Sequence, residues 1–331
     1  MAPTLSCNKG IMKENSGAQV HQAPCDEDAR KVAVSHLGSS DCTIRRYPTG
    51  LCHYVYEVVP KDEKPFVVRM SRSDLGGMLR SAQYWSDVLR PMGVPLPATL
   101  ATNFDAQFPY MILERLDGRD LGEVYATLTP AIRKQAAQSV ASWQLIAASL
   151  PEARGFGYAA SFDDPQLLSS WAEVLDSQMN RTRAWMQTGG VGQLSMVDRV
   201  QELIHQERAY LDDIKPRPFL HDTTTKNVLV SERGVHGVVD IDDVCFGDRL
   251  YVLSLTNMAF ISMRLDMDYI TYWREAWNLS SLQEKMLRLY TAAHCACFIS
   301  ELGLGFNKAA APVDQERKLL LEETFEALVS Q

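Results

Sequence analysis

The 331-residue sequence lacks any long uninterrupted hydrophobic run. Its first residues, MAPTLSCNKGIMKENSG, have no apolar core of the length that a signal peptide needs. Farther along, charged residues interrupt each apolar segment before the roughly 20 residues that a transmembrane helix requires. These absences predict a cytoplasmic protein with no membrane partner.

The sequence also lacks paired cysteines. Its seven cysteines are scattered and none forms a CxxC pair, so neither a zinc site nor a disulfide framework is expected. The nearest approach, HCAC at 294–297, lies in the apolar run LRLYTAAHCACFISEL, where the two cysteines are best interpreted as small buried core residues. This use of cysteine is typical of a reducing compartment.

An excess of basic residues is missing as well. The formal net charge is −8 and the pI is near 5.4. A nucleic-acid-binding surface needs clustered Lys and Arg, so no nucleic-acid partner is expected. An acidic chain suits a cationic small ligand better. A monomer and a homodimer are both compatible with this composition.

What the sequence does contain is a change of pattern along the chain. Residues 1–25 have no periodicity and predict a flexible tail. Residues 26–114 predict a first lobe, which begins with a short helix and continues as a β-rich antiparallel meander with a second helix at about 74–90. Its β-like runs are CTIRRY, LCHYVYEVV, PFVVRMS, PATLATNF and YMILERL.

Residues 115–331 predict a second, mostly helical lobe. In LTPAIRKQAAQSVASWQLIAASL, apolar residues recur at spacings of three and four, which is typical of an amphipathic helix. Residues 164–185 and 195–212 show the same pattern. Within this lobe, VLV (228–230) and GVVDI (237–241) predict a small hairpin with SERG between its strands. The fold class is therefore α+β.

The hairpin carries the residues most suited to chemistry. Asp222 is followed five positions later by Asn227, and Asp240 lies across the hairpin. Phosphoryl transfer needs a carboxylate at the attacking hydroxyl, a divalent metal ion on the phosphates and rigid placement of both. Asp222 is predicted as the catalytic base, and Asn227 and Asp240 supply the hard oxygen ligands that Mg²⁺ prefers.

Three neighbouring residues each allow two interpretations. Asp242 and Asp243 enlarge the acidic group and suit either a second metal ion or stabilisation of the loop. Since alternate strand residues point to one face, Asp242 is the expected further metal ligand beside Asp240. His221, adjacent to Asp222, suits either a general base or a buried structural histidine.

The stretch HDTTTKNVLVSERGVHGVVDIDDVCFGDRLY resembles the aminoglycoside phosphotransferase and choline kinase-like family, relatives of protein kinases. That family carries the same Asp, the Asn five residues later, the second Asp after the next strand, and a Gly-Asp pair, here Gly247 and Asp248. The resemblance implies a bilobal protein-kinase-like fold, Mg²⁺, and ATP or GTP as the phosphate donor.

The resemblance also implies a nucleotide site in the first lobe. RRYPTGLCHYVYEVV is similar to the family's phosphate-positioning hairpin, where backbone N–H groups around Thr49 and Gly50 would face phosphate. Arg69 stands where the family carries a Lys or Arg that pairs with the phosphates. The hinge, which binds adenine through its main chain, would be formed by Leu113, Glu114 and Arg115.

The sequence departs from the family in two places. His221 is adjacent to Asp222, whereas the family usually has His two residues before the Asp. In addition, the helix at 74–90 has no aligned glutamate to pair with Arg69, which leaves the partner of Arg69 unassigned.

Together these features predict a kinase that phosphorylates a hydroxyl of a small molecule. An antibiotic (aminoglycoside or macrolide) and a metabolite such as an amino alcohol or sugar both remain candidate acceptors. The aromatic-rich residues 266–277 and Glu301 are candidates for the acceptor pocket, although helix-core packing explains the aromatic residues equally well. The alternative is a pseudokinase-like regulator that binds nucleotide without turnover, which the irregular loop and missing glutamate would suit.

Overall fold

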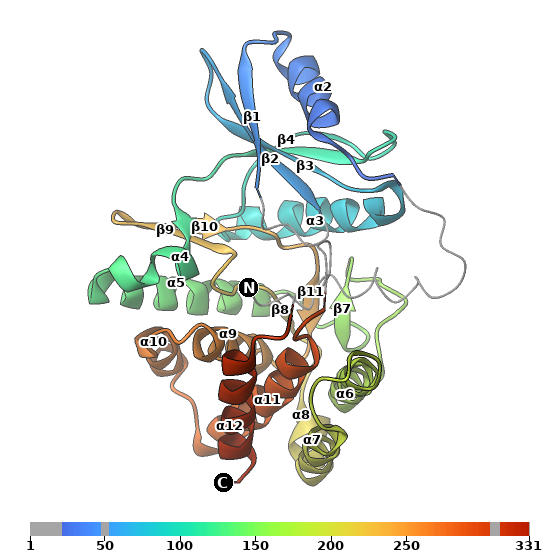
Figure 1. Ribbon diagram of the computed structural model, residues 1–331, viewed down its shortest axis with the longest axis vertical. Coiled ribbons are helices and arrows are strands. Elements are labelled where there is room, and N and C mark those ends of the chain that lie inside the picture. The colour runs from blue at the N-terminus through green and yellow to red at the C-terminus, as the bar shows by residue number, and fades with distance from the viewer. Residues whose placement is uncertain (1–21, 48–52, 305–311, 331) are drawn as a thin grey trace.

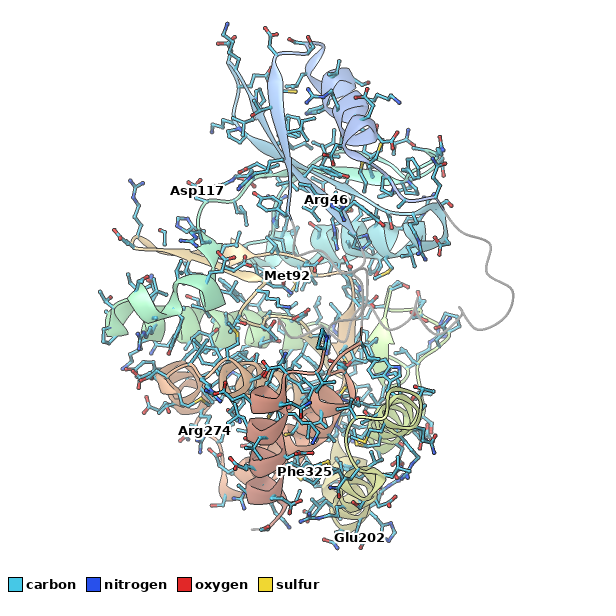
Figure 2. All side chains as sticks on the ribbon, viewed as in Figure 1. Arg46, Met92, Asp117, Glu202, Arg274 and Phe325 are labelled. Atoms are coloured by element: carbon cyan, nitrogen blue, oxygen red, sulfur yellow. The ribbon has the colours of Figure 1, made fainter. Side chains whose placement is uncertain are left out.

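The computed structural model describes residues 22–47, 53–304 and 312–330, which form two lobes stacked along the long axis of the molecule (Figure 1). Most of the predicted tail, and the predicted phosphate-contacting residues Thr49 and Gly50, lie outside the described residues. The side chains of both lobes are drawn in Figure 2, where the label of Asp117 marks the linker between the N-terminal and C-terminal lobes.

The N-terminal lobe contains a five-stranded antiparallel sheet with the order β1-β2-β3-β5-β4. The predicted meander of the first three strands is confirmed, because β1 pairs with β2 and β2 with β3, both antiparallel. The strands are β1 (Cys42–Arg46), β2 (Tyr54–Pro60), β3 (Phe66–Met70), β4 (Thr99–Asn103) and β5 (Tyr110–Glu114).

The short helix predicted from Asp26 is confirmed as α2 (Asp26–Leu37), which covers part of this sheet. Its first turn is acidic, which complements the helix dipole. Gly38 ends it in the left-handed conformation, with φ of 67°. Ala29 and Ala33, one turn apart, are fully buried in the core cluster under the sheet. Small side chains therefore let the helix approach the strands closely.

Helix α3 (Gly76–Leu89) lies between the sheet and the C-terminal lobe (Figure 1). Leu79 packs with Met111 of β5 in a small cluster. On its other side the indole N–H of Trp85, which is fully buried, donates to the carbonyl of Ala159 over 2.8 Å. The helix thus contacts both lobes.

The C-terminal lobe is mainly helical. The predicted helix at 195–212 is in fact two, α7 and α8, and the one predicted from 164 begins only at Trp171. The helices are α4 (Leu121–Val124), α5 (Pro130–Ala148), α6 (Trp171–Gly189), α7 (Leu194–Gln206), α8 (Arg208–Asp213), α9 (Leu250–Ser262), α10 (Asp268–Trp277), α11 (Ser281–Ser300) and α12 (Gln315–Val329).

Two small sheets, with the orders β10-β9-β6 and β7-β11-β8, lie in the part of the C-terminal lobe that is nearer to the N-terminal lobe (Figure 1). The second of these was not predicted, because strands of three residues leave almost no periodic pattern. The strands are β6 (Arg119–Asp120), β7 (Gly157–Ala159), β8 (Pro218–Leu220), β9 (Val228–Ser231), β10 (Gly234–Val238) and β11 (Val244–Phe246).

The second strand of the hairpin differs from the prediction at both ends. Strand β10 begins at Gly234 rather than at Gly237, and it ends at Val238 rather than at Ile241. Asp240 has a φ of 65°, a left-handed conformation that ends the extended chain. The strand-alternation argument that paired Asp240 with Asp242 was therefore wrong, since neither residue lies in a strand.

The core of the C-terminal lobe is built around α9 and α11. Helix α9 is apolar on almost every side and nearly all of its residues are buried, as expected of a central helix. Cys295 and Cys297 of α11 are buried free thiols, which confirms their interpretation as core residues. In the described part of the chain, no helix combines the length and apolar character needed to cross a bilayer.

Candidate active site

A cleft of about 620 Å³ lies between the lobes. Its walls include residues of the upper sheet and of the loops that border the β9–β10 hairpin. Among the lining residues are Val55, Arg69 and Leu113 from the N-terminal lobe, and Asn227, Asp240 and Asp242 from the C-terminal lobe. The structure therefore brings together residues that are far apart in the sequence.

The loop between β8 and β9 carries Asp222 and Asn227. The Asn227 amide nitrogen donates to the main-chain carbonyl of Asp222 over 2.9 Å, and the Thr224 hydroxyl donates to Asp222 Oδ1, also over 2.9 Å. The N–H of Val239 donates to the carbonyl of Asn227 over 2.9 Å. These bonds fix the Asp–Asn spacing and connect the loop to the segment that carries Asp240.

Gln144 of α5, which was not predicted as a site residue, stabilises this loop through hydrogen bonds. Gln144 of α5 is fully buried, and its amide bonds to both the N–H and the carbonyl of Leu220, each over 2.8 Å, and to the Thr223 hydroxyl over 2.9 Å. The sequence did contain a signal for this role: Gln144 stands four residues after Val140 and is a polar residue on an otherwise apolar helix face. A polar residue at such a position needs a specific partner.

Asp222 is 3% exposed, and its Oδ2 atom has no hydrogen-bond partner among the described residues. Burial raises the pKa of Asp222 to about 6, and the charge of Asp240 adds to the rise. The hydrogen bond from Thr224 and the charge of Lys226 act in the opposite direction. A carboxylate with this pKa and one free oxygen is suited to accept a proton near neutral pH.

Arg69 of β3 finds its partner in two carboxylates rather than in a helix glutamate. Its Nη2 atom is bonded to Asp240 and lies 2.6 Å from Asp242 Oδ1. Burial alone would raise the pKa of Asp242, but the charge of Arg69 and the contact with His53 outweigh it and hold that pKa below its ordinary range. The unassigned partner of Arg69 is thus identified.

His221 is 1% exposed, and burial lowers its pKa to about 3, so the ring is neutral at physiological pH. Its Nε2 atom lies 3.0 Å from the Tyr158 hydroxyl, and its ring stacks on Tyr251. These contacts favour the structural interpretation of His221 over a role as general base.

The predicted hinge residues Leu113, Glu114 and Arg115 all line the cleft. Glu114 is engaged with Ala98, since its N–H donates to the Ala98 carbonyl over 2.8 Å and its carboxylate accepts from the Ala98 N–H over 3.1 Å. Arg115 pairs with Glu57 at 3.1 Å. Both side chains therefore hold the linker in place, and contact with adenine through the main chain stays a prediction.

The donor set at the cleft fits Mg²⁺. Because the Asn227 amide nitrogen is bonded to Asp222, its amide oxygen is the end left for a cation. Asp240 adds a carboxylate whose side chain is 43% exposed. Oxygen ligands of this kind are those that Mg²⁺ prefers. Within the described ranges, no group of three or more His, Cys, Asp and Glu side chains is arranged as a metal centre.

The candidate acceptor residues have mixed outcomes. Tyr269, Trp273 and Trp277 of α10 are buried in the core, so the aromatic stretch is largely explained by packing. Glu301 is 6% exposed and its Oε2 atom has no partner among the described residues. Burial raises the pKa of Glu301 to about 8, although Cys297 donates to its other oxygen over 3.5 Å.

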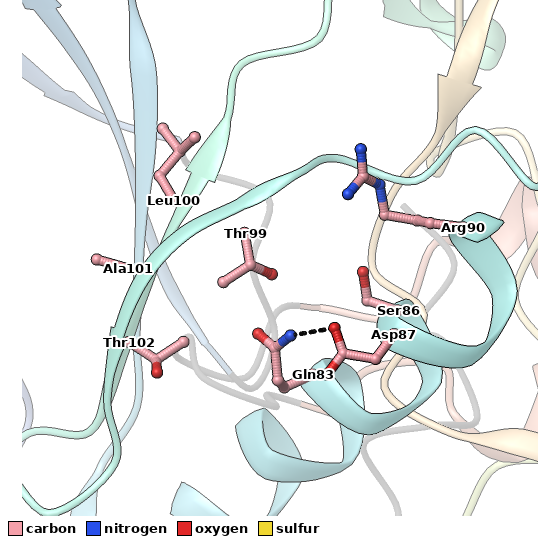
Figure 3. A pocket seen from close by; sticks show the side chains of 8 residues that line it. All are labelled: Gln83, Ser86, Asp87, Arg90, Thr99, Leu100, Ala101 and Thr102. Atoms are coloured by element: carbon pink, nitrogen blue, oxygen red, sulfur yellow. Dashed lines mark hydrogen bonds between the residues drawn. The ribbon is translucent and has the colours of Figure 1, made fainter.

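A second, smaller pocket lies between α3 and β4 (Figure 3). The Gln83 amide donates to Asp87 over 2.7 Å at its floor. Ser86 and Thr99 line both this pocket and the cleft. The two pockets therefore share part of their lining.

The sequence matches the phosphotransferase enzyme family over residues 43–286. The chain belongs to this family. The match spans more than half of the chain and confirms that this protein is a phosphotransferase, as the catalytic loop predicted. No curated protein matches the sequence.

Solved structures similar to this phosphotransferase share its fold at low sequence identity. Aminoglycoside phosphotransferase APH(4)-Ia superimposes with a TM-score of 0.66 and 15% identity, covering 91% of this chain and 97% of that chain. The gentamicin complex of APH(2")-IIa gives 0.63 and 13%, with coverages of 94% and 98%. The predicted bilobal, kinase-like α+β fold is confirmed.

Proposed function

We propose that this phosphotransferase is a Mg²⁺-dependent kinase that transfers the γ-phosphate of ATP or GTP to a hydroxyl of a small acceptor. The observation that carries the proposal is Asp222: a buried carboxylate with one unpartnered oxygen, on a loop whose Asn227 and Thr224 hold it rigidly beside a cleft. Positioning of this kind supplies much of the catalysis in phosphoryl transfer.

Asp222 accepts or orients the hydroxyl proton of the acceptor. Asn227 and Asp240 are the proposed ligands of Mg²⁺, which when bound would neutralise charge on the nucleotide phosphates. The sequence also predicted Asp242 as a further ligand, but its two carboxylate oxygens face His53 and Arg69. Arg69 is at hydrogen-bonding distance from both Asp240 and Asp242. It is therefore placed to exchange a carboxylate for a phosphate oxygen when nucleotide enters.

The nucleotide site is supported by the relatives of similar fold. One structure of APH(4)-Ia is a ternary complex with AMP-PNP and hygromycin B, and another relative, an aminoglycoside 2'-phosphotransferase, is a GDP complex. In this chain, adenine or guanine would lie against the hinge residues Leu113, Glu114 and Arg115. Backbone N–H groups around Thr49 and Gly50 remain the proposed phosphate contacts.

The acceptor is proposed to be a small hydroxylated molecule, either an antibiotic or a related metabolite. Relatives have been captured with hygromycin B, gentamicin and streptomycin. Here Glu301 offers an unpartnered carboxyl oxygen, but the charges of Arg181, Arg317 and Lys226 also act on Glu301. Because basic groups surround this acid, an acceptor panel should include neutral polyols as well as polycations.

The deciding experiment measures phosphate transfer to an acceptor panel with Mg²⁺ and either ATP or GTP. Asp222→Asn is expected to lower kcat by about 10²- to 10⁴-fold, because the proton acceptor is removed. The dissociation constant of the nucleotide should stay unchanged. Asp213→Asn, on the exposed surface of α8, is the matched control.

Full transfer by Asp222→Asn would contradict the assigned role of Asp222. Tight nucleotide binding without transfer to any acceptor would instead support the pseudokinase-like regulator.

A further inference from the structure

We propose that Asp242 anchors the two lobes to each other instead of binding Mg²⁺, and that His53 is the positioning residue that holds this anchor. The inference rests on the proposed nucleotide site. It assigns Asp240 and Asn227 as the metal ligands and gives Asp242 a separate task.

The first contact is made by His53, which directly precedes β2. Its Nε2 atom lies 3.0 Å from Asp242 Oδ2, although 189 positions separate the two residues in the chain. The side chains are 4% and 3% exposed, so water does not compete for this bond. A histidine–carboxylate contact that is buried to this degree is a specific connection between lobes.

The second contact is made by Arg69 of β3, whose Nη2 atom lies 2.6 Å from Asp242 Oδ1. Each carboxylate oxygen of Asp242 therefore faces a different side chain of the N-terminal lobe. A third element joins them, because the Ser81 hydroxyl of α3 donates to the main-chain carbonyl of Asp242. Asp242 is thus contacted by the residue before β2, by β3 and by α3.

Asp240 has a different environment. Its side chain is 43% exposed, whereas that of Asp242 is 3% exposed. Asp240 forms an ion pair with Arg69 and lines the cleft together with Asn227. Asp240 thus has open space for a cation, while a cation at Asp242 would have to displace both His53 and Arg69.

The anchor has a functional consequence. Transfer requires that the phosphates, which the N-terminal lobe positions, stand close to Asp222 in the C-terminal lobe. The Asp242 contacts fix the distance between these parts before any ligand arrives. Ser81 also takes the place of the missing helix glutamate, since it connects α3 to the site through Asp242.

The test measures the dissociation constant of a non-hydrolysable ATP or GTP analogue, with and without Mg²⁺, by calorimetry. The variants are His53→Ala, Asp242→Asn, the double variant, and Asp240→Asn. Loss of a hydrogen bond to a charged group predicts about tenfold weaker binding for His53→Ala and for Asp242→Asn. The factor should be the same with and without Mg²⁺, and the double variant should bind no more weakly than the single variants.

Asp240→Asn should behave differently by removing only the gain in affinity that Mg²⁺ provides. His53→Gln, which keeps a donor near the position of Nε2, is expected to restore most of the binding. This rescue, with melting temperatures for all variants, separates positioning from general unfolding.

The inference is overturned if Asp242→Asn removes the Mg²⁺-dependent gain, if His53→Ala binds like the wild type, or if the two losses add in the double variant. These outcomes leave the proposed function intact. Failure of the wild-type protein to bind any nucleotide would overturn both.

Discussion

At the scale of single residues, burial decides which polar groups are available for chemistry. Asp222 and Glu301 are both nearly inaccessible and each keeps one unpartnered oxygen among the described residues. His221 is equally buried, but its contacts with Tyr158 and Tyr251 and its low pKa of about 3 keep it neutral. Adjacent positions in HDTTTKN therefore differ in their environment, because His221 packs in the core and Asp222 keeps one oxygen without a partner among the described residues.

The hydrogen bonds of Gln144 are expected to stabilise the loop that carries Asp222 and Asn227. Gln144→Leu keeps the volume but leaves the N–H and carbonyl of Leu220 without their bonds. The free energy of unfolding is expected to fall by about 2–4 kcal/mol, because unsatisfied buried groups are costly. The check is denaturant unfolding together with kcat, which should fall more than nucleotide affinity.

The control for this variant is Gln138→Leu, on the exposed face of the same helix. Equal losses from the two substitutions would contradict the bracing role of Gln144.

Glu301 should make stability depend on pH. Its folded pKa of about 8 lies above its ordinary value of 4.5. The stability that its protonated form contributes is fully present below about pH 4.5 and is lost as the pH rises through about 8. The slope from one such proton is up to about 1.4 kcal/mol per pH unit.

The measurement is the unfolding free energy of the wild type and of Glu301→Gln between pH 5 and about pH 8. The wild type should lose stability relative to the variant across this range. Parallel curves would show that the Glu301 carboxyl is not protonated in the fold.

At the scale of elements, the connection between β11 and α9 is constrained by close packing. Gly247, between β11 and α9, has a φ of 155°, and a Cβ atom there would lie 2.2 Å from the Trp171 ring. Trp171 is fully buried and donates to the Tyr290 hydroxyl over 3.0 Å, so it has no room to move. Packing against Trp171 therefore requires glycine at position 247.

Gly247→Ala is accordingly expected to destabilise the protein by more than about 3 kcal/mol, comparable to severe overpacking. Gly77→Ala in α3 is the matched control, since a Cβ atom there meets nothing within 4 Å. That control should be neutral or stabilise by about 0.5–1 kcal/mol. The measurement is the melting temperature of each variant. Similar melting temperatures for Gly247→Ala and Gly77→Ala would contradict the steric argument.

Prediction of elements from sequence succeeded where the pattern was long. Helices α2 and α5 and the β1–β2–β3 meander follow directly from caps, apolar spacing and turns. The sheet β7-β11-β8 was missed because its strands are too short for periodicity to show, and the separation of α7 from α8 at Glu207 carries no proline or glycine marker.

At the scale of the whole molecule, the lobes meet through charge as well as packing. If nucleotide and Mg²⁺ bind in the cleft, they should stabilise the folded protein by about 2.7 kcal/mol at a hundredfold excess over the dissociation constant. The expected result is a higher melting temperature with the analogue plus Mg²⁺ than with either alone. In Asp240→Asn the extra effect of Mg²⁺ should disappear, and its persistence would exclude Asp240 as a ligand.

The sequence by itself determined the fold class, the family and the positions of Asp222, Asn227 and Asp240, because these depend on local spacing within one loop and its hairpin. Only the tertiary structure decided the partners of Arg69 and the bracing role of Gln144. It also showed the contact between His53 and Asp242. These are contacts between residues 76 to 189 positions apart, and one sequence contains no local pattern that specifies them.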